Sequence, residues 1–164
     1  MTTSTILRCF VVSAFAATGC FNGKMASKQP ASSELTSNTL EKEKWHWNNP
    51  QKQNDSAGYA QVVKAGNMIY VSGVATDDVS PKGIANVYKA LGQCLKTFGA
   101  TPQNIVKETL YTTDIETMKK HNDARKSFYK GDFPAATWVQ ISRLYEPGAW
   151  LEVDIIAQLP ESGK

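Results

Sequence analysis

The sequence is poor in the side chains that build metal centres and disulfide frameworks. Its 164 residues include three cysteines, at positions 9, 20 and 94, and two histidines, His46 and His121. The cysteines form neither a CxxC pair nor a zinc-binding spacing. The histidines are too few and too far apart to form a His-built metal centre. The sequence therefore predicts neither a metal site nor a disulfide-stapled scaffold.

A large excess of charge of one sign is also missing. The 18 Lys and Arg residues face 15 Asp and Glu residues, which leaves a net charge of +3. No basic stripe with interleaved aromatic residues is present, so the electrostatic footprint of an RNA or DNA binder is absent. Without a basic groove or a paired-histidine acid/base arrangement, a ribonuclease is also disfavoured. We expect no nucleic-acid partner.

Near the N-terminus, residues 9–18 form an apolar run, CFVVSAFAAT, that is too short to cross a bilayer. A membrane-spanning helix needs about 20 apolar residues. The run follows Arg8 and leads through small residues into Cys20, which is typical of a secretory signal peptide. Ending on cysteine, the segment resembles a bacterial lipoprotein signal. We therefore predict a signal peptide over 1–19, lipidation at Cys20, and a periplasm-facing lipoprotein on the outer or inner membrane. The alternatives are a plain secretory signal and a buried N-terminal segment.

The next segment, residues 20–55, is polar and has almost no apolar periodicity. Such a segment buries too little surface to offset its chain entropy, which predicts a tether ahead of a folded domain over 56–164. The sequence Trp45-His46-Trp47 stands out within it. Its indoles could contact a partner. We favour packing of the indoles on the folded domain, which would then begin near Trp45.

The remaining sequence predicts strands and two helices, in the order β-β-α-β-α-β-β. Apolar residues at helical spacing predict a helix from Gly83 to Phe98, and a Thr113-x-x-Glu116 capping box predicts a second helix. Alternating or β-branched segments predict strands at residues 59–65, 68–72 (ended by Gly73), 105–113, 137–144 and 150–159. This α+β pattern predicts a sheet with both helices on one face, and a homo-oligomer could bury the other face.

Three segments, at residues 58–73, 99–114 and 133–157, together resemble the RidA (YjgF-like) family of reactive-intermediate deaminases. The resemblance spans about residues 56–160 in the right order. It implies a chorismate-mutase-like fold and a homotrimer with small-molecule clefts between its subunits. It also implies hydrolysis of 2-imino or enamine acids to 2-keto acids and ammonia without a cofactor.

The resemblance also assigns site residues. Tyr59 matches a cleft tyrosine, Thr137 a Ser/Thr position, and Asp154 the acidic residue that orients the attacking water. Ala136 stands where the family has a carboxylate-binding arginine, and Trp138 is expected to fill part of the cleft. The chain thus resembles the arginine-lacking branches of the family, and its activity on free 2-imino acids is in doubt. We expect the remaining candidate cations, Arg125 and Arg143, to form interface or surface salt bridges rather than replace that arginine.

Two functions follow as hypotheses. The first is a RidA-like imine or enamine hydrolase in which Asp154 activates water as a general base. The second is a membrane-tethered, non-catalytic trimer that binds a small ligand or an envelope partner. A water-accessible carboxylate favours the first function, and an indole that plugs the cleft favours the second.

Overall fold

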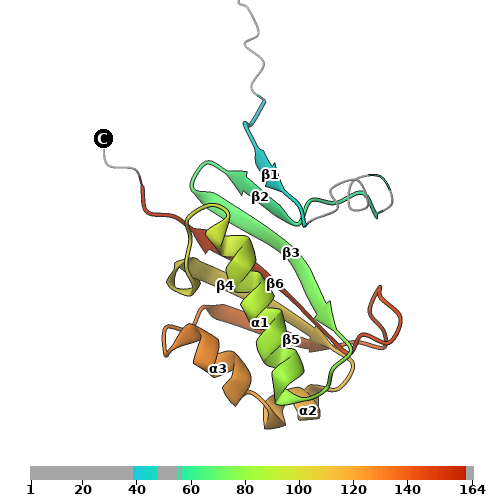
Figure 1. The fold of residues 1–164 in the computed structure, drawn as a ribbon. Helices are drawn as coiled ribbons and strands as arrows, with labels where there is room; N and C mark the ends of the chain where they lie inside the picture. The colour runs from blue at the N-terminus through green and yellow to red at the C-terminus, as the bar shows by residue number, and fades with distance from the viewer. Residues whose placement is uncertain (1–38, 48–54, 56, 162–164) are drawn as a thin grey trace, which may run out of the picture. The chain divides into compact units, whose positions relative to one another are not determined.

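A six-stranded sheet forms the centre of the structure, and its helices pack on one face (Figure 1). The computed structural model describes residues 39–47, 55 and 57–161. The predicted signal peptide at 1–19 and the predicted lipidation site Cys20 lie outside the described residues. In the part of the chain that is described, no helix has the length and apolarity needed to cross a membrane.

The order of strands in the sheet is β1-β2-β3-β6-β4-β5. Neighbouring strands are antiparallel except for β4 and β5, which are parallel. A parallel pair needs a crossover, and two short helices, α2 and α3, supply it. The elements are β1 (Glu43–Trp45), β2 (Val62–Ala65), β3 (Met68–Thr76), α1 (Pro81–Lys96), η2 (Pro102–Asn104), β4 (Ile105–Thr112), α2 (Ile115–Lys120), α3 (Asp123–Tyr129), β5 (Ala135–Gln140) and β6 (Leu151–Gln158). The predicted α+β class is confirmed.

Helix α1 covers the middle of the sheet and contacts β3 and β6. It begins after Ser80, whose side chain accepts a hydrogen bond from the backbone N–H of Gly83. Its apolar stripe is buried, including Ile84 and Leu91, as the helical spacing predicts. After the helix, Gly99 adopts a positive φ of 74°, a conformation that glycine allows without steric cost.

The predicted second helix is in fact two helices. Asp114 rather than Thr113 caps α2, because its side chain accepts the backbone N–H of Thr117. The chain leaves helical geometry at His121, where φ is −105° and ψ is 17°, and resumes as α3. Met118, Arg125 and Tyr129 supply the buried side chains of the pair. This irregularity explains why the apolar periodicity of the segment is weak.

Strand β3 continues beyond Gly73, where the sequence predicts its end. The pairing of β3 with β6 shifts between Val71 and Val74 and then resumes as far as Thr76. Glycine within a strand often marks such an irregularity, so Gly73 bends the strand without ending it.

Strand β1 belongs to the sheet, although it lies within the range 20–55 assigned to a tether. It pairs with β2 through Glu43 opposite Lys64 and Trp45 opposite Val62. The rings of Trp45 and Trp47 lie 4.9 Å apart, edge to face, and both side chains pack against the core. This packing agrees with the expectation that the indoles lie on the folded domain, and it places ordered chain before residue 56.

Candidate functional site

The face of the sheet opposite the helices carries a polar group of residues. Side chains along a strand point alternately to its two faces. In β6 the buried residues Val153 and Ile155 flank Asp154, which is half-buried and lies on the open face. Asp154 is opposite Thr109 of β4, and Thr109 is beside Thr137 of β5. The carboxylate and the two threonines therefore share this open face.

Asp154 is the central carboxylate of the group. The hydroxyls of Thr109 and Tyr111 lie close enough to Asp154 to lower its pKa by hydrogen bonding. Burial raises the pKa of Asp154, while these hydrogen bonds and the positive charge of Lys107 oppose the rise. A carboxylate with a pKa closer to neutral is a stronger general base toward water than an ordinary aspartate.

A second carboxylate, Glu152, is the next residue along the same face of β6. Its side chain lies against Gly73 of β3, where an added Cβ would overlap the Oε1 atom of Glu152. Burial raises the pKa of Glu152, and the negative charges of Asp154 and Glu146 raise it further. The absence of a side chain at position 73 thus creates the space that this half-buried carboxylate occupies.

Within one chain, Thr137 and Tyr59 lie on opposite sides of Asp154, each separated from its strand by one other strand of the sheet. Tyr59 is 41% exposed and precedes β2. The backbone N–H of Ser72 donates to the carbonyl of Gln61, so the segment with Tyr59 runs along the outer side of β3. Strand β6 follows on the other side of β3 and Thr137 lies farther along the sheet, beyond β4.

Ala136 and Trp138 alternate with Thr137 and face the helices. Ala136 lies beside Glu108, and Trp138 lies beside the buried Leu110. The ring of Trp138 is 5.5 Å from the Cζ atom of Arg125. Trp138 therefore does not cover Asp154, which is on the opposite face of the sheet.

Beside Ala136, Arg125 forms a salt bridge as expected, but with Glu108 in a buried network, missed by sequence reasoning, rather than at an interface or surface. Glu108 is completely buried and accepts a hydrogen bond of 2.8 Å from Nε of Arg125. The hydroxyls of Tyr88 and Tyr129 donate to the same carboxylate, at 3.1 and 2.5 Å. The Arg125 guanidinium also lies 4.9 Å from the ring centroid of Tyr129 and 5.8 Å from that of Phe133. A buried ion pair requires such additional hydrogen bonds, because desolvation of both charges is costly.

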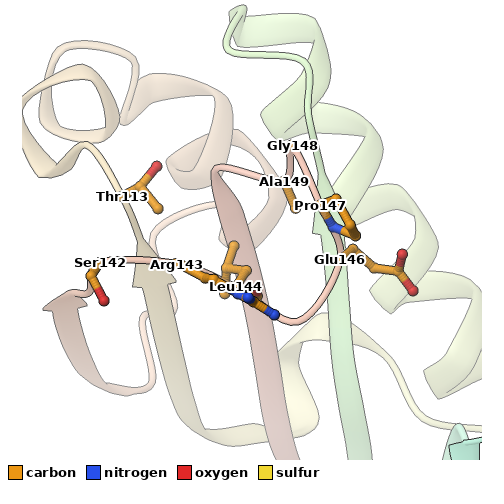
Figure 2. A pocket seen from close by; sticks show the side chains of 8 residues that line it. All are labelled: Thr113, Ser142, Arg143, Leu144, Glu146, Pro147, Gly148 and Ala149. Atoms are coloured by element: carbon orange, nitrogen blue, oxygen red, sulfur yellow. Dashed lines mark hydrogen bonds between the residues drawn. The ribbon is translucent and has the colours of Figure 1, made fainter.

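An open hollow of about 320 Å³ lies at the end of the sheet where β4 and β5 end and β6 begins (Figure 2). Arg143 and Glu146 are its charged lining residues. Nε of Arg143 donates to the carbonyl of Leu144 at 3.2 Å, and the negative charge of Glu146, together with that of Asp154, raises the pKa of Glu152. The hollow therefore adjoins the carboxylate row of β6. Its lining residues are Thr113, Ser142, Arg143, Leu144, Glu146, Pro147, Gly148 and Ala149.

The chemistry of the open face is that of proton transfer and hydrogen bonding. Within the described ranges, no group of three or more His, Cys, Asp or Glu side chains is placed to hold a metal ion. Asp154 and Glu152 can accept protons, while Thr109, Tyr111 and Thr137 carry hydroxyls. Lys107 adds one positive charge. This set suits activation of a water molecule beside a small polar ligand.

Comparisons with known proteins agree with this description. Residues 50–159 match the family model described as Endoribonuclease L-PSP. The 2-iminobutanoate/2-iminopropanoate deaminase of Rattus norvegicus is 33% identical over 108 residues, covering 60% of this chain and 78% of the relative. Reactive Intermediate Deaminase A, chloroplastic, of Arabidopsis thaliana is 28% identical over 111 residues, covering 62% of this chain and 58% of the relative.

Solved structures show the same fold. A member of the YjgF/YER057c/UK114 family from Mycobacterium tuberculosis superposes with a TM-score of 0.65 at 20% identity, covering 73% of this chain and 100% of that one. A Rid-family protein of unknown function from Yersinia pestis gives a TM-score of 0.57 at 29% identity, with 62% and 87% covered. These neighbours share the chorismate-mutase-like fold. The chain therefore belongs to the Endoribonuclease L-PSP family, that is, the RidA or YjgF family.

Proposed function

We propose that this chain hydrolyses small imines or enamines to keto compounds and ammonia, with Asp154 as the general base. The observation that carries the proposal is the setting of Asp154 on the open face. It is half-buried, its pKa is raised by burial, and the hydroxyls of Thr109 and Tyr111 lie beside it. The family and the named deaminases among its relatives support the same reaction class.

The proposed reaction needs only water and proton transfer. Asp154 takes a proton from a water molecule as the water oxygen adds to the carbon of the C=N bond. The protonated Asp154 donates this proton to the nitrogen of the resulting carbinolamine, the C–N bond breaks, and ammonia leaves. Loss of the hydroxyl proton leaves a C=O bond, so one imine and one water give one keto compound and one ammonia. A base whose pKa lies nearer the working pH transfers these protons faster.

The assembly and location belong to the same proposal. A homotrimer would cover the open faces and form small-molecule clefts between subunits, where Tyr59 of one subunit could approach Asp154 of another. Lipid at Cys20 would tether the trimer to a membrane of the cell envelope. The rival function is a tethered trimer that binds a ligand without chemistry. The position of Trp138, on the face away from Asp154, favours the hydrolase.

The experiment is ammonia release from 2-iminopropanoate generated in situ by an amino-acid oxidase. The wild-type protein, Asp154→Asn and the matched control Asp123→Asn are compared against the uncatalysed rate. Asp123 is a suitable control because its side chain is 94% exposed on α3. We expect acceleration by the wild type and the control, and loss of about 10²-fold or more in Asp154→Asn.

Two results of this experiment would contradict the proposal. No acceleration by the wild type on 2-iminopropanoate or on 2-iminobutanoate would overturn the hydrolase. Equal rates for the wild type and Asp154→Asn would remove Asp154 from the mechanism.

A further inference from the structure

A cation beside Asp154 would decide which imines the proposed site accepts. A 2-imino acid carries its carboxylate on the carbon that water attacks. The group that binds the carboxylate must therefore lie within a few ångströms of the base. Position 136 supplies no such group, because its side chain is a methyl group on the face toward the helices.

Neither Arg125 nor Arg143 is placed to bind the substrate carboxylate beside Asp154. Arg125 lies on the face of the sheet opposite Asp154, and its Nε is bonded to both carboxylate oxygens of Glu108, at 2.8 and 3.2 Å. Arg143 lines the hollow beyond the end of β4. Thr113 of that hollow is four residues along from Thr109, the partner of Asp154, or about 13 Å at the rise of a strand.

Lys107 occupies the required place. It lies on β4 beside Ile156 of β6, while Thr109 lies beside Asp154, so Lys107 and Asp154 are diagonal neighbours on the open face. Diagonal neighbours across an antiparallel pair have Cα atoms about 7–8 Å apart. The positive charge of Lys107 acts directly on Asp154 and favours its ionised form.

The ammonium of Lys107 is oriented but not neutralised. Its Nζ donates to Oγ1 of Thr137 at 2.5 Å. Among the described residues, no ion pair with nitrogen and oxygen within 4.0 Å joins Lys107 to Asp154. An ammonium has three N–H donors, so two are left to bind an anion beside Thr137.

We propose that Lys107, oriented by Thr137, binds the carboxylate of an anionic 2-imino acid and places its imine carbon beside Asp154. This assignment rests on the proposed function and narrows its substrate class to anionic imines. A lysine provides a point charge rather than the two-pronged contact of an arginine. The site should therefore favour small anions over neutral imines by charge and orient them less strictly than an arginine would.

The experiment measures binding apart from catalysis. Pyruvate, the keto product, and pyruvamide, its neutral analogue, are titrated into the full-length wild-type protein and into Lys107→Met by NMR. Lys89→Met is the matched control, because Lys89 is exposed on α1. We expect pyruvate to bind the wild type and Lys89→Met equally and Lys107→Met about tenfold or more weakly. Pyruvamide should bind all three proteins weakly, and Lys107→Arg should retain pyruvate binding.

The outcomes separate this inference from the proposed function. Equal affinity of the wild type and Lys107→Met for pyruvate, or failure of the wild type to bind pyruvate, overturns the role of Lys107. Hydrolysis of 2-iminopropanoate with the same KM in both proteins also overturns it, although the hydrolase then stands. Pyruvate binding that depends on Lys107, without hydrolysis by the wild type, supports the anion site and removes the hydrolase.

Discussion

Asp154 and Glu152 lie two residues apart on one strand, and both side chains face the open side of the sheet. Burial raises the pKa of each carboxyl above its ordinary value. The folded protein therefore holds these two protons more tightly than the unfolded chain does. A group of this kind contributes stability at low pH, and the contribution is lost as the pH rises through the folded-state pKa.

We predict that Asp154 and Glu152 make the free energy of unfolding fall as the pH rises above about 4, the ordinary range of these carboxyls. The double variant Asp154→Asn/Glu152→Gln should lose this part of the slope. Urea unfolding at a series of pH values would measure it, with Asp123→Asn as the control. Parallel slopes for the double variant and the wild type would contradict the prediction.

The sequence position of Ala136 suggests a place in the ligand cleft, whereas in the structure its side chain faces the helices. Its neighbour across the strand pair is Glu108, whose carboxylate already holds the guanidinium of Arg125. Ala136 is itself exposed, so an arginine introduced there would extend from the surface of this face and bring a second positive charge near the first. The charge balance of this buried network thus depends on residues from α3 and β4.

At the scale of elements, the irregular middle of β3 shapes the site. The register of β3 against β6 shifts between Val71 and Val74, and Gly73 lies in this interval. The carboxylate of Glu152 lies over Gly73 because no side chain fills that space. A bend in one strand therefore sets the burial of a carboxylate on the next.

We predict that Gly73→Ala moves the Glu152 carboxylate toward solvent and lowers its pKa toward the ordinary glutamate value. Burial is the main cause of the raised pKa of Glu152, so its loss should reverse most of the shift. Carboxyl ¹³C NMR titration would measure the change, with Gly92→Ala on α1 as the control. A Glu152 titration that is the same in the variant and the wild type would refute the role assigned to Gly73.

At the scale of the whole molecule, a single chain leaves the face of the sheet opposite the helices open. Tyr70 of β3 is 45% exposed and Val139 of β5 is 37% exposed. By strand alternation both side chains share the face of Asp154, beside Ile156 and Tyr111. Exposed apolar groups on one face of a sheet are typical of surfaces that self-association covers.

We predict that the purified protein is a trimer and that Val139→Lys weakens it, because a charge would be buried between subunits. Native mass spectrometry over a concentration series would report the assembly. Val79→Lys is the control, since Val79 is 56% exposed in the segment before α1. A monomeric wild type, or a Val139→Lys protein as trimeric as the wild type, would argue against this interface.

Local sequence patterns were sufficient for much of the fold. The stripe from Ile84 to Leu95 predicts α1 because helical periodicity depends only on neighbouring residues. The family resemblance likewise identified Thr137 and Asp154 as site candidates. It could not show which residues surround them. Glu108 falls on the buried phase of β4, the same phase as Leu110, and this was the available signal for the missed network.

The sequence by itself determined the α+β class and the family, since these follow from local periodicity and motif order, and it named Asp154 as the candidate for water activation. Only the tertiary structure decided that β1 joins the sheet, that Trp138 and Ala136 face the helices, and that Lys107 lies beside Asp154. The physical reason is strand register. A shift by one residue moves a side chain to the opposite face, and long-range pairing, rather than the local sequence, sets that register.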